Sequence, residues 1–258
     1  MTDINQRIET LANLILQVKH IVIFTGAGIS TESGISDYRG PTGMWKKYNP
    51  ADFTIQKFLS SYETRRQRWQ MLIEGGLALN ARPNRAHKAI AELDGLGKLD
   101  CIITQNIDNL HQRAGVSKNK IFELHGNMKR VICLNCHQTF TIEEVMEKIK
   151  KGTEVPDCPD CHGLLKPDVV FFGEQLPQKT LEQAIHYSQI CDLFIAIGST
   201  LSVYPAAYMP LYAINSGAKL AIINLSPTEL DSYATILIPG KAGEVMTTLL
   251  HIVRNKIS

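Results

Sequence analysis

The stretch IVIFTGAG at residues 21–28 decides the fold. It begins with four apolar residues without alternation, which is typical of a strand buried on both faces of a parallel sheet, and it ends in glycines that allow a tight turn. Further apolar runs lie at residues 99–104, 169–172, 193–198, 220–225 and 236–238, and helical patterns lie at residues 3–18, 84–94, 177–190, 205–216 and 242–255. This alternation predicts an α/β fold with a Rossmann-like, doubly wound parallel sheet.

Four cysteines form two closely spaced pairs, Cys133-Leu-Asn-Cys136 and Cys158-Pro-Asp-Cys161. Two residues between the cysteines of a pair let both sulfurs bind one ion, and two pairs supply the four thiolates that Zn²⁺ prefers. Since four protein ligands leave no position for water, we expect a structural zinc. The alternatives are disulfides or unrelated thiols, and both are disfavoured because nothing else in the chain resembles a secreted protein.

Two stretches interrupt the alternation of strands and helices. Residues 45–80 have a mostly helical pattern, and residues 129–164 contain the cysteine pairs and one short helix near 142–150. We expect both to leave the main sheet and to form a smaller module together. The predicted division is a Rossmann-like domain of residues 1–44, 84–128 and 165–258, a helical module of residues 45–83 and a zinc-binding module of residues 129–164.

The composition is that of an ordinary globular protein of 258 residues, with 44% hydrophobic and 20% charged residues. A net charge of +2 implies no general attraction to nucleic acid or membrane. No apolar run approaches the roughly 20 residues that span a bilayer, and residues 1–10 lack the apolar run of a signal peptide. We therefore expect a cytoplasmic protein, in which the remaining cysteines, Cys101 and Cys191, are buried.

Polar residues follow several of the predicted strands, where open α/β sheets bind their ligands. The turn Gly26-Ala27-Gly28 suits the approach of backbone N–H groups to phosphates, although Thr31 stands where the strict G-x-G-x-x-G pattern has its third glycine. The polar run at residues 31–41 is predicted to be a mobile lid over a ligand. The alternative is a surface loop without function.

A second polar cluster, Gln105, Asn106 and Asp108, follows the predicted strand at residues 99–104. Two amides and one carboxylate suit recognition of a carboxamide and of ribose hydroxyls. The alternative is that Asn106 and Asp108 cap the following helix. Gly198-Ser199-Thr200 and Asn224 stand at two further strand ends, and they suit either ribose and phosphate or plain turns.

Taken in order along one chain, these stretches resemble the sirtuins, a family of NAD-dependent protein-lysine deacylases. The resemblance extends from about residue 5 to about residue 250, and its motifs are GAGIS with SGISDYRG, TQNIDNLHQRAG, ELHGN, CLNC with CPDC, PDVVFFGE, IGSTLSVYPAA and INLSPT.

The resemblance implies roles for individual positions. His125 in ELHGN is the implied general base, and an imidazole suits this role because its pKa lies near the working pH. Asn106 and Asp108 complete the implied catalytic set. The implied NAD contacts are Gly26, Ala27, Gly28, Ser30, Asp37, Tyr38, Arg39, Gln105, Asn106, Ile107, Asp108, Gly198, Ser199, Thr200, Asn224, Leu225, Ser226 and Ala242. The implied substrate contacts are Val170, Phe171, Phe172, Gly173, Glu174, Val203 and Tyr204, and the implied zinc ligands are Cys133, Cys136, Cys158 and Cys161.

The implied reaction removes acetyl or longer acyl groups from protein lysines and gives nicotinamide and O-acyl-ADP-ribose. The implied cofactors are NAD and structural zinc, and the implied partners are acyl-lysine proteins or peptides, without specific nucleic acid or membrane binding. ADP-ribosyl transfer to protein and NAD hydrolysis remain alternatives with the same NAD site. A non-catalytic module has no need of His125, and a zinc ribbon that binds nucleic acid is disfavoured because acids such as Glu143 and Glu144 dilute the charge of Lys129 and Arg130.

The sequence departs from the sirtuin pattern in the lid. Sirtuins usually have GIPDFR there, and this chain has Ser36 and Tyr38 in GISDYR. Because losing proline frees a backbone dihedral, we expect a looser lid. The lid and KPDVVFFGE also resemble the sirtuin subgroup tied to lipoyl-type acyl removal and ADP-ribosyl transfer.

A second feature of the sequence, a Tyr-x-x-Arg pair, concerns the kind of acyl group that could be removed. Sirtuins that remove succinyl or malonyl groups use a Tyr-x-x-Arg pair, and Tyr62 and Arg65 have this spacing, although they lie farther before Arg82-Pro83-Asn84 than is usual. The alternative is that Arg65, Arg66 and Arg68 form a solvated helix face.

Overall fold

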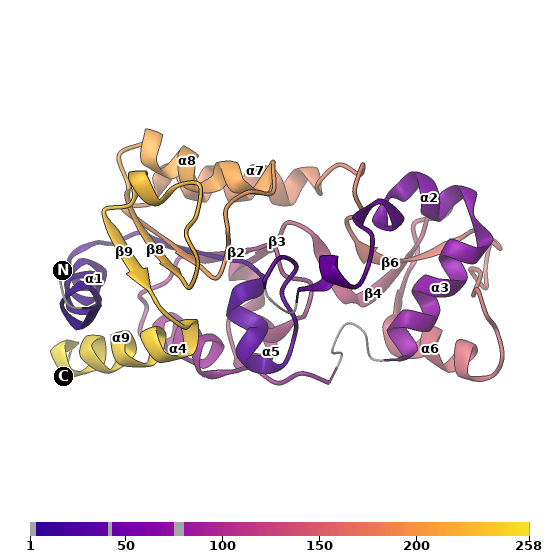
Figure 1. Ribbon diagram of the computed structural model, residues 1–258, viewed down its shortest axis with the longest axis horizontal. Coiled ribbons are helices and arrows are strands. Elements are labelled where there is room, and N and C mark those ends of the chain that lie inside the picture. Colours follow the sequence, from indigo (N-terminus) through magenta and orange to yellow (C-terminus); the bar gives the residue numbers. More distant parts are fainter. Residues whose placement is uncertain (1–3, 41–42, 75–79, 258) are drawn as a thin grey trace.

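The computed structural model describes residues 4–40, 43–74 and 80–257. Residue 3 of the first predicted helix and residues 75–79 of the predicted helical module lie outside this range. Figure 1 shows a larger part built around one sheet and a smaller part at the other end of the long axis. None of the helices in the described ranges combines the length and the apolar composition that crossing a membrane requires.

The larger part contains a six-stranded sheet, and its strands have the order β3-β2-β1-β7-β8-β9. All neighbouring pairs are parallel, which confirms the predicted fold class. The order reverses between β1 and β7, and ligands of such sheets bind at this point. The strands are β1 (Ile21–Thr25), β2 (Cys101–Thr104), β3 (Ile121–Glu123), β7 (Leu193–Ile197), β8 (Lys219–Asn224) and β9 (Ile236–Pro239).

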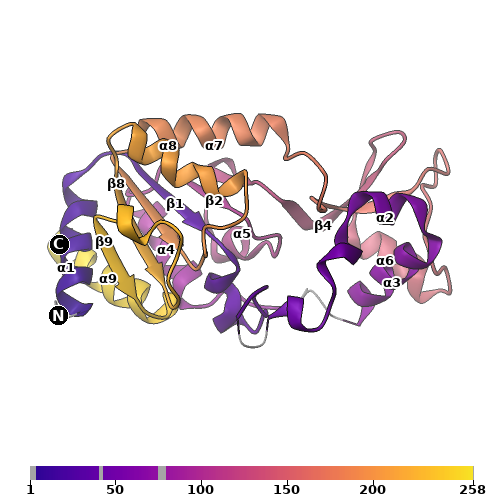
Figure 2. The ribbon, with the colours of Figure 1, turned by 45° about the horizontal axis from the view of Figure 1, so that its top comes forward.

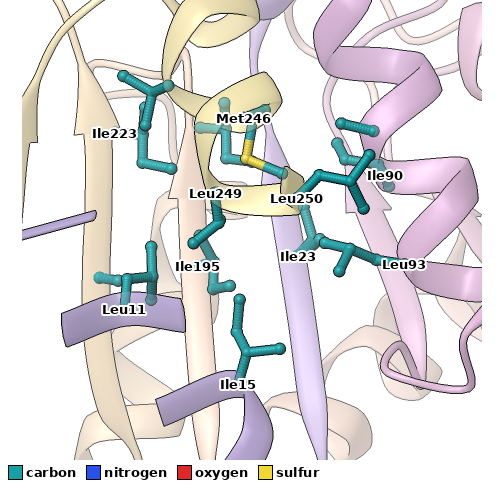
Figure 3. Close-up of a cluster of buried hydrophobic side chains, with 14 of the residues drawn as sticks. Leu11, Ile15, Ile23, Ile90, Leu93, Ile195, Ile223, Met246, Leu249 and Leu250 are labelled. Carbon is teal, nitrogen blue, oxygen red and sulfur yellow. The ribbon is translucent and has the colours of Figure 1, made fainter. Parts of the chain in front are cut away.

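Different helices cover the two faces of this sheet (Figure 2). One face packs against α1 (Ile4–Gln17), α4 (Arg85–Gly95) and α9 (Ala242–Ile257), and the other packs against α7 (Gln178–Ile190) and α8 (Met209–Asn215). In β1, Ile23 belongs to the first core, where it lies near Ile195 and Leu249 (Figure 3), while Val22 and Phe24 belong to the second. Burying each such side chain contributes about 1.5–3 kcal/mol, so the strands are held from both faces.

The smaller part is built on a second, antiparallel sheet of β5 (Thr139–Thr141), β4 (Gly126–Cys133) and β6 (Leu165–Val169). Its helices are α2 (Ile55–Ser60), α3 (Tyr62–Ile73) and α6 (Ile142–Lys150). One buried cluster joins Trp69 of α3 to Val131 of β4 and Ile142 of α6. The two stretches that interrupt the alternation therefore share one core, as expected from the sequence.

One strand prediction was wrong, and one strand of the main sheet was not predicted. The run at residues 169–172 was expected in the main sheet, but the strand is Leu165–Val169 and it pairs with β4 in the small sheet. Its first half contains Lys166 and Pro167, which do not read as a buried strand. The main sheet instead has β3, which the sequence did not reveal because only the middle one of its three residues is buried. The predicted domain boundaries stay predictions.

Candidate active site

A cavity of about 710 Å³ lies at the carboxyl ends of the central strands, and both parts of the molecule line it. Its size is that of a small-molecule site. The predicted NAD positions that line it are Gly26, Ala27, Gly28, Asp37, Tyr38, Arg39, Gln105, Asn106, Ile107, Gly198, Ser199, Thr200, Asn224, Leu225, Ser226 and Ala242. His125 and the predicted peptide positions Val170, Phe171, Phe172, Gly173, Glu174, Val203 and Tyr204 line it as well. Ser30 and Asp108 are not part of the lining.

The turns that follow β1 and β7 line this cavity, and their backbones are in direct contact there. Gly28 N donates to Gly198 O at 2.8 Å, and a Cβ on Gly28 would lie only 2.7 Å from that oxygen. Gly198 has a φ of +64°, a conformation that side chains disfavour. Glycine at both positions therefore lets the two turns meet, and such a glycine-lined turn fits the diphosphate of NAD.

His125 occupies the link between β3 and β4. Its Nδ1 lies 3.0 Å from the backbone oxygen of Gln105. Because a carbonyl oxygen only accepts, Nδ1 carries the proton and Nε2 keeps a free lone pair. Burial lowers the pKa of His125, and the hydrogen bond to Gln105 offsets this only in part. The ring is therefore neutral at pH 7, and Nε2 is the nitrogen available to accept a proton.

The loop after β2 connects the ends of three strands. Gln105 Nε2 donates to Ser199 Oγ at 3.0 Å, and Asn106 Nδ2 donates to Gly26 O at 3.0 Å. These bonds tie the loop to the turns after β7 and β1. The capping alternative does not apply to Asn106, because within the described part of the chain no backbone N–H of α5 (Leu110–Ala114) donates to its side chain.

Asp108 lies beside this loop as a partly buried carboxylate. It accepts hydrogen bonds from Ser30 Oγ at 2.7 Å and from Leu110 N at 2.9 Å, so it also caps α5 (Leu110–Ala114). Burial raises the pKa of Asp108, and the two hydrogen bonds partly offset the rise. Burial also raises the pKa of Tyr38, and the charge of Asp108 raises it further.

The lid is tied to the small module through an aromatic contact. The rings of Tyr38 and Trp45 have centroids 5.1 Å apart, and Trp45 in turn lies 5.8 Å from Phe172. Within the lid, Asp37 Oδ1 accepts from Gly40 N at 2.8 Å. The expected looseness of the lid concerns motion and stays a prediction.

Most backbone groups of residues 170–174 already have partners. Val170 N donates to His125 O, Phe172 N donates to Phe53 O and Phe172 O accepts from Ile55 N, each at 3.0 Å. Phe171 N donates to the Glu174 carboxylate at 2.6 Å, and Glu174 N donates to Phe171 O at 3.0 Å. Among the described residues, no group bonds Val170 O or either backbone group of Gly173.

The four paired cysteines meet at one point in the small module. Their sulfur atoms all lie within 4.8 Å of one another, with 3.4 Å between Cys133 and Cys161 and 3.7 Å between Cys136 and Cys158. A tetrahedral zinc with Zn–S bonds of about 2.3 Å sets its sulfurs about 3.8 Å apart, so the cluster fits this ion. None of the four cysteines lines the cavity, in agreement with a structural role.

The Tyr-x-x-Arg pair does not reach the cavity lining. Tyr62 OH bonds Glu154, and Arg65 Nη1 donates to the oxygens of Phe58 and Leu59. This contradicts the hypothesis that Tyr62 and Arg65 bind an acyl carboxylate.

The alternative that Arg65, Arg66 and Arg68 form a solvated helix face does not hold for Arg68. Its side chain is half-buried and lines the cavity beside Met71 and Leu72, with its guanidinium carbon 3.2 Å from the centroid of the Phe53 ring. Burial lowers the pKa of Arg68 to about 10, so it stays charged at pH 7. Residues 68, 71 and 72 share one side of a helix, and this spacing is the signal that was available in the sequence.

Comparisons with known proteins agree with this geometry. A family model described as the Sir2 family matches residues 26–205. The NAD-dependent protein deacetylase 1 of Pyrobaculum aerophilum is 44% identical over 97% of this chain and 96% of its own length. The NAD-dependent protein deacylase 2 of Archaeoglobus fulgidus is 45% identical over 96% of both chains.

Solved structures of Sir2 proteins are also similar to this chain. One described as "Structural Basis for the Mechanism and Regulation of Sir2 Enzymes" is 44% identical and superposes with a TM-score of 0.88 over 97% of this chain and 99% of its own. One described as a complex of Sir2, a p53 peptide and NAD+ is 40% identical, with a TM-score of 0.87 over 96% and 98% of the two chains. This chain therefore belongs to the Sir2 family.

Proposed function

We propose that this protein removes acyl groups from protein lysines in an NAD-dependent reaction that gives nicotinamide and O-acyl-ADP-ribose. The observation that carries the proposal is the neutral His125, whose Nε2 is free beside a glycine-lined cavity and an amide-rich loop. Relatives named as NAD-dependent protein deacetylases and deacylases support it over nearly the full length of the chain.

The NAD site is assigned to the carboxyl ends of four strands of the main sheet, β1, β2, β7 and β8. When bound, NAD supplies an electrophilic ribose carbon, because departure of nicotinamide leaves positive charge there. The turn after β1, the loop after β2 and the segments after β7 and β8 hold the dinucleotide across the point where the strand order reverses. Gln105 and Asn106 orient the nicotinamide end, since their side chains are fixed by Ser199 and Gly26.

His125 is the general base that takes a proton from a ribose hydroxyl onto Nε2. The bond from Nδ1–H to Gln105 O fixes the tautomer and stabilises the imidazolium that forms. Asn106 contacts the reacting groups from the cavity wall. Asp108 lies outside the lining and positions the loop through Ser30 and Leu110.

The substrate binds as an extended peptide through β-addition. The backbone groups of Gly173 and the backbone oxygens of Val170 and Glu174 are the ones that residues 170–174 leave without a protein partner in the described chain. Val203 and Tyr204, which line the same cavity, contact the peptide from the other side. Backbone pairing of this kind tolerates many sequences around the modified lysine.

The partner is a protein, and the site of action is the cytoplasm. A nucleic-acid role for the zinc module is not supported, because Lys129 pairs with Glu143 at 2.8 Å and Arg130 pairs with Asp168 at 2.7 Å. Thiolates that hold zinc need a reducing compartment, which supports the cytoplasm.

The function is tested by mass spectrometry of the protein with NAD and acetyl-, succinyl-, lipoyl- and long-chain acyl-lysine peptides. We expect deacylated peptide and O-acyl-ADP-ribose only when NAD is present. Nicotinamide release with every peptide intact would reject deacylation, and ADP-ribose attached to protein would identify a transferase.

His125→Ala should lower turnover by about 10²–10⁴-fold while retaining zinc, because the base is lost and the fold is not. Deacylation by this variant at the wild-type rate would refute the role of His125.

The pH dependence follows from the pKa of His125. A general base must be neutral, so activity is lost as the pH falls through its pKa, which burial holds below 6.5. We therefore expect the acid limb of kcat/KM to lie below about pH 6.5. NMR titration of labelled histidine, with the His125 signal assigned by its absence from His125→Ala, should give the same midpoint. A midpoint above that value would contradict the buried, neutral ring.

Metal removal should unfold the small module, since zinc binding and folding are coupled. We expect a strong chelator, or Cys158→Ala, to lower the melting temperature and to abolish peptide turnover. Cys101→Ala is the matched control, because Cys101 is equally buried but lies in the main sheet. Full zinc content by metal analysis in Cys158→Ala would show that the cluster is not the zinc site.

Arg68 should favour acyl groups that end in a carboxylate. Within residues 4–40, 43–74 and 80–257, no carboxylate lies within ion-pair distance of this cavity-lining guanidinium. We expect succinyl-lysine to react faster than its carboxamide analogue, and Arg68→Gln to reduce that ratio by about tenfold. Arg66→Gln is the control, because Arg66 is exposed and pairs with Glu63. A ratio of one in the wild type would exclude this preference.

A further inference from the structure

Lys166 is a buried lysine in β6, with only 4% of its surface exposed. Its ammonium donates to Val169 O at 2.6 Å and to the Glu174 carboxylate at 2.9 Å. The same nitrogen lies 4.6 Å from the centroid of the Phe171 ring. Two of the three ammonium donors are thus used in hydrogen bonds, and the ring adds a cation–π contact. Each neighbour belongs to residues 169–174, the segment that lines the cavity.

The Glu174 carboxylate accepts hydrogen bonds from two groups, the Lys166 ammonium and a backbone N–H of its own segment. The carboxylate oxygen that accepts from Lys166 also accepts from Phe171 N at 2.6 Å. The side chain of Glu174 therefore turns inward to the turn that precedes it. This differs from the role of direct substrate contact that the family resemblance implies for Glu174.

Gly173 lies between two fixed points. On one side, Phe172 is bonded through both of its backbone groups to Phe53 and Ile55. On the other side, Glu174 is bonded to the Lys166 ammonium. Gly173 has a φ of +87°, and its own backbone groups have no bonding partner in the described chain. The direction of these free groups is thus set by the two residues that flank them.

Stability alone does not account for this arrangement. Taking the Lys166 ammonium out of water has a large free-energy cost, which its partly exposed partner Glu174 offsets, and apolar side chains in the same space are often as stable or more stable. What a buried ion pair supplies is fixed geometry. Here both hydrogen bonds of the ammonium and its ring contact go to one short segment, residues 169–174.

We propose that the ion pair between buried Lys166 and partly buried Glu174 is a positioning device that holds Gly173 in the geometry for docking the substrate peptide. The proposal rests on the proposed function, since it concerns the peptide site of that reaction. Lys166 and Glu174 act through the backbone of the segment and not by touching the reacting atoms. Their loss should therefore weaken peptide binding far more than NAD binding.

The test compares Lys166→Met, Lys166→Arg and Lys120→Met. Methionine keeps the length of the side chain without its charge, and arginine keeps donors for Val169 and Glu174. Lys120 is the control, because it forms a comparable ion pair with Asp94 at 2.7 Å, and neither Lys120 nor Asp94 is part of the cavity lining. For each variant we would measure the Kd of an acetyl-lysine peptide and of NAD by calorimetry, the peptide KM, the zinc content and the unfolding midpoint.

We expect Lys166→Met to raise the peptide Kd and KM by at least about tenfold, because breaking a buried pair leaves a charge uncompensated. The Kd of NAD should change by less than about threefold, since effects at sites without shared partners are nearly independent. Lys166→Arg should recover most of the peptide affinity, and Lys120→Met should lower only stability. If Lys166→Met does not fold, Glu174→Gln should show a smaller shift in the same direction.

Two outcomes separate this inference from the function on which it rests. Wild-type protein that turns over the peptide while Lys166→Met keeps the wild-type peptide Kd, or loses NAD and peptide affinity equally, would overturn the positioning role alone. Wild-type protein that binds no acetyl-lysine peptide would overturn both. Wild-type protein that binds the peptide without turnover would reject deacylation, and the shift in peptide Kd would still decide the role of Lys166.

Discussion

The contact between Gly28 and Gly198 is the constraint on which the active site depends. The 2.8 Å hydrogen bond between their backbones brings together the turns after β1 and β7, which are adjacent parallel strands at the reversal of the strand order. A side chain at Gly28 would push these turns apart. Gln105 and Asn106 then reach across to the same two turns from the loop after β2. The cavity thus forms where three strand ends are fixed to one another.

The polar character of the site begins inside the strands themselves. Thr25 and Thr104 are the last residues of β1 and β2, and both are buried. Thr25 Oγ1 donates to Thr104 Oγ1 at 2.8 Å and lies 2.9 Å from His111 Nε2. Burying such groups costs free energy unless they are hydrogen-bonded. The apolar pattern of each strand therefore ends one residue early, where the network behind the cavity starts.

Sequence patterns predicted the elements that depend on the local order of apolar and polar residues. They failed where the choice of partner strand decides which sheet a strand joins. The run at residues 21–24 is apolar without interruption, so its burial in a parallel sheet could be inferred. The run at residues 169–172 is equally apolar, but the strand beside it forms because β4 is available as an antiparallel partner. The predicted cavity positions were found from motifs, except that Ser30 and Asp108 lie outside the lining. Arg68 was missed because a charge on a helix usually faces solvent, and only tertiary packing turns it inward.

His125, the proposed base, and residues 170–174, the proposed docking segment, are mechanically connected, and this follows from their places in the chain. His125 lies on the link between β3, an edge strand of the main sheet, and β4 of the small sheet. Its backbone oxygen accepts from Val170 N at 3.0 Å, directly after β6, while its ring is bonded to Gln105 in the main sheet's loop. A shift of the small module relative to the large one would therefore displace the base and the peptide site together. The core beneath β4 and β6, which the cysteine cluster extends, also supports the cavity wall, because Met128, Val169 and Phe171 belong to this core and line the cavity.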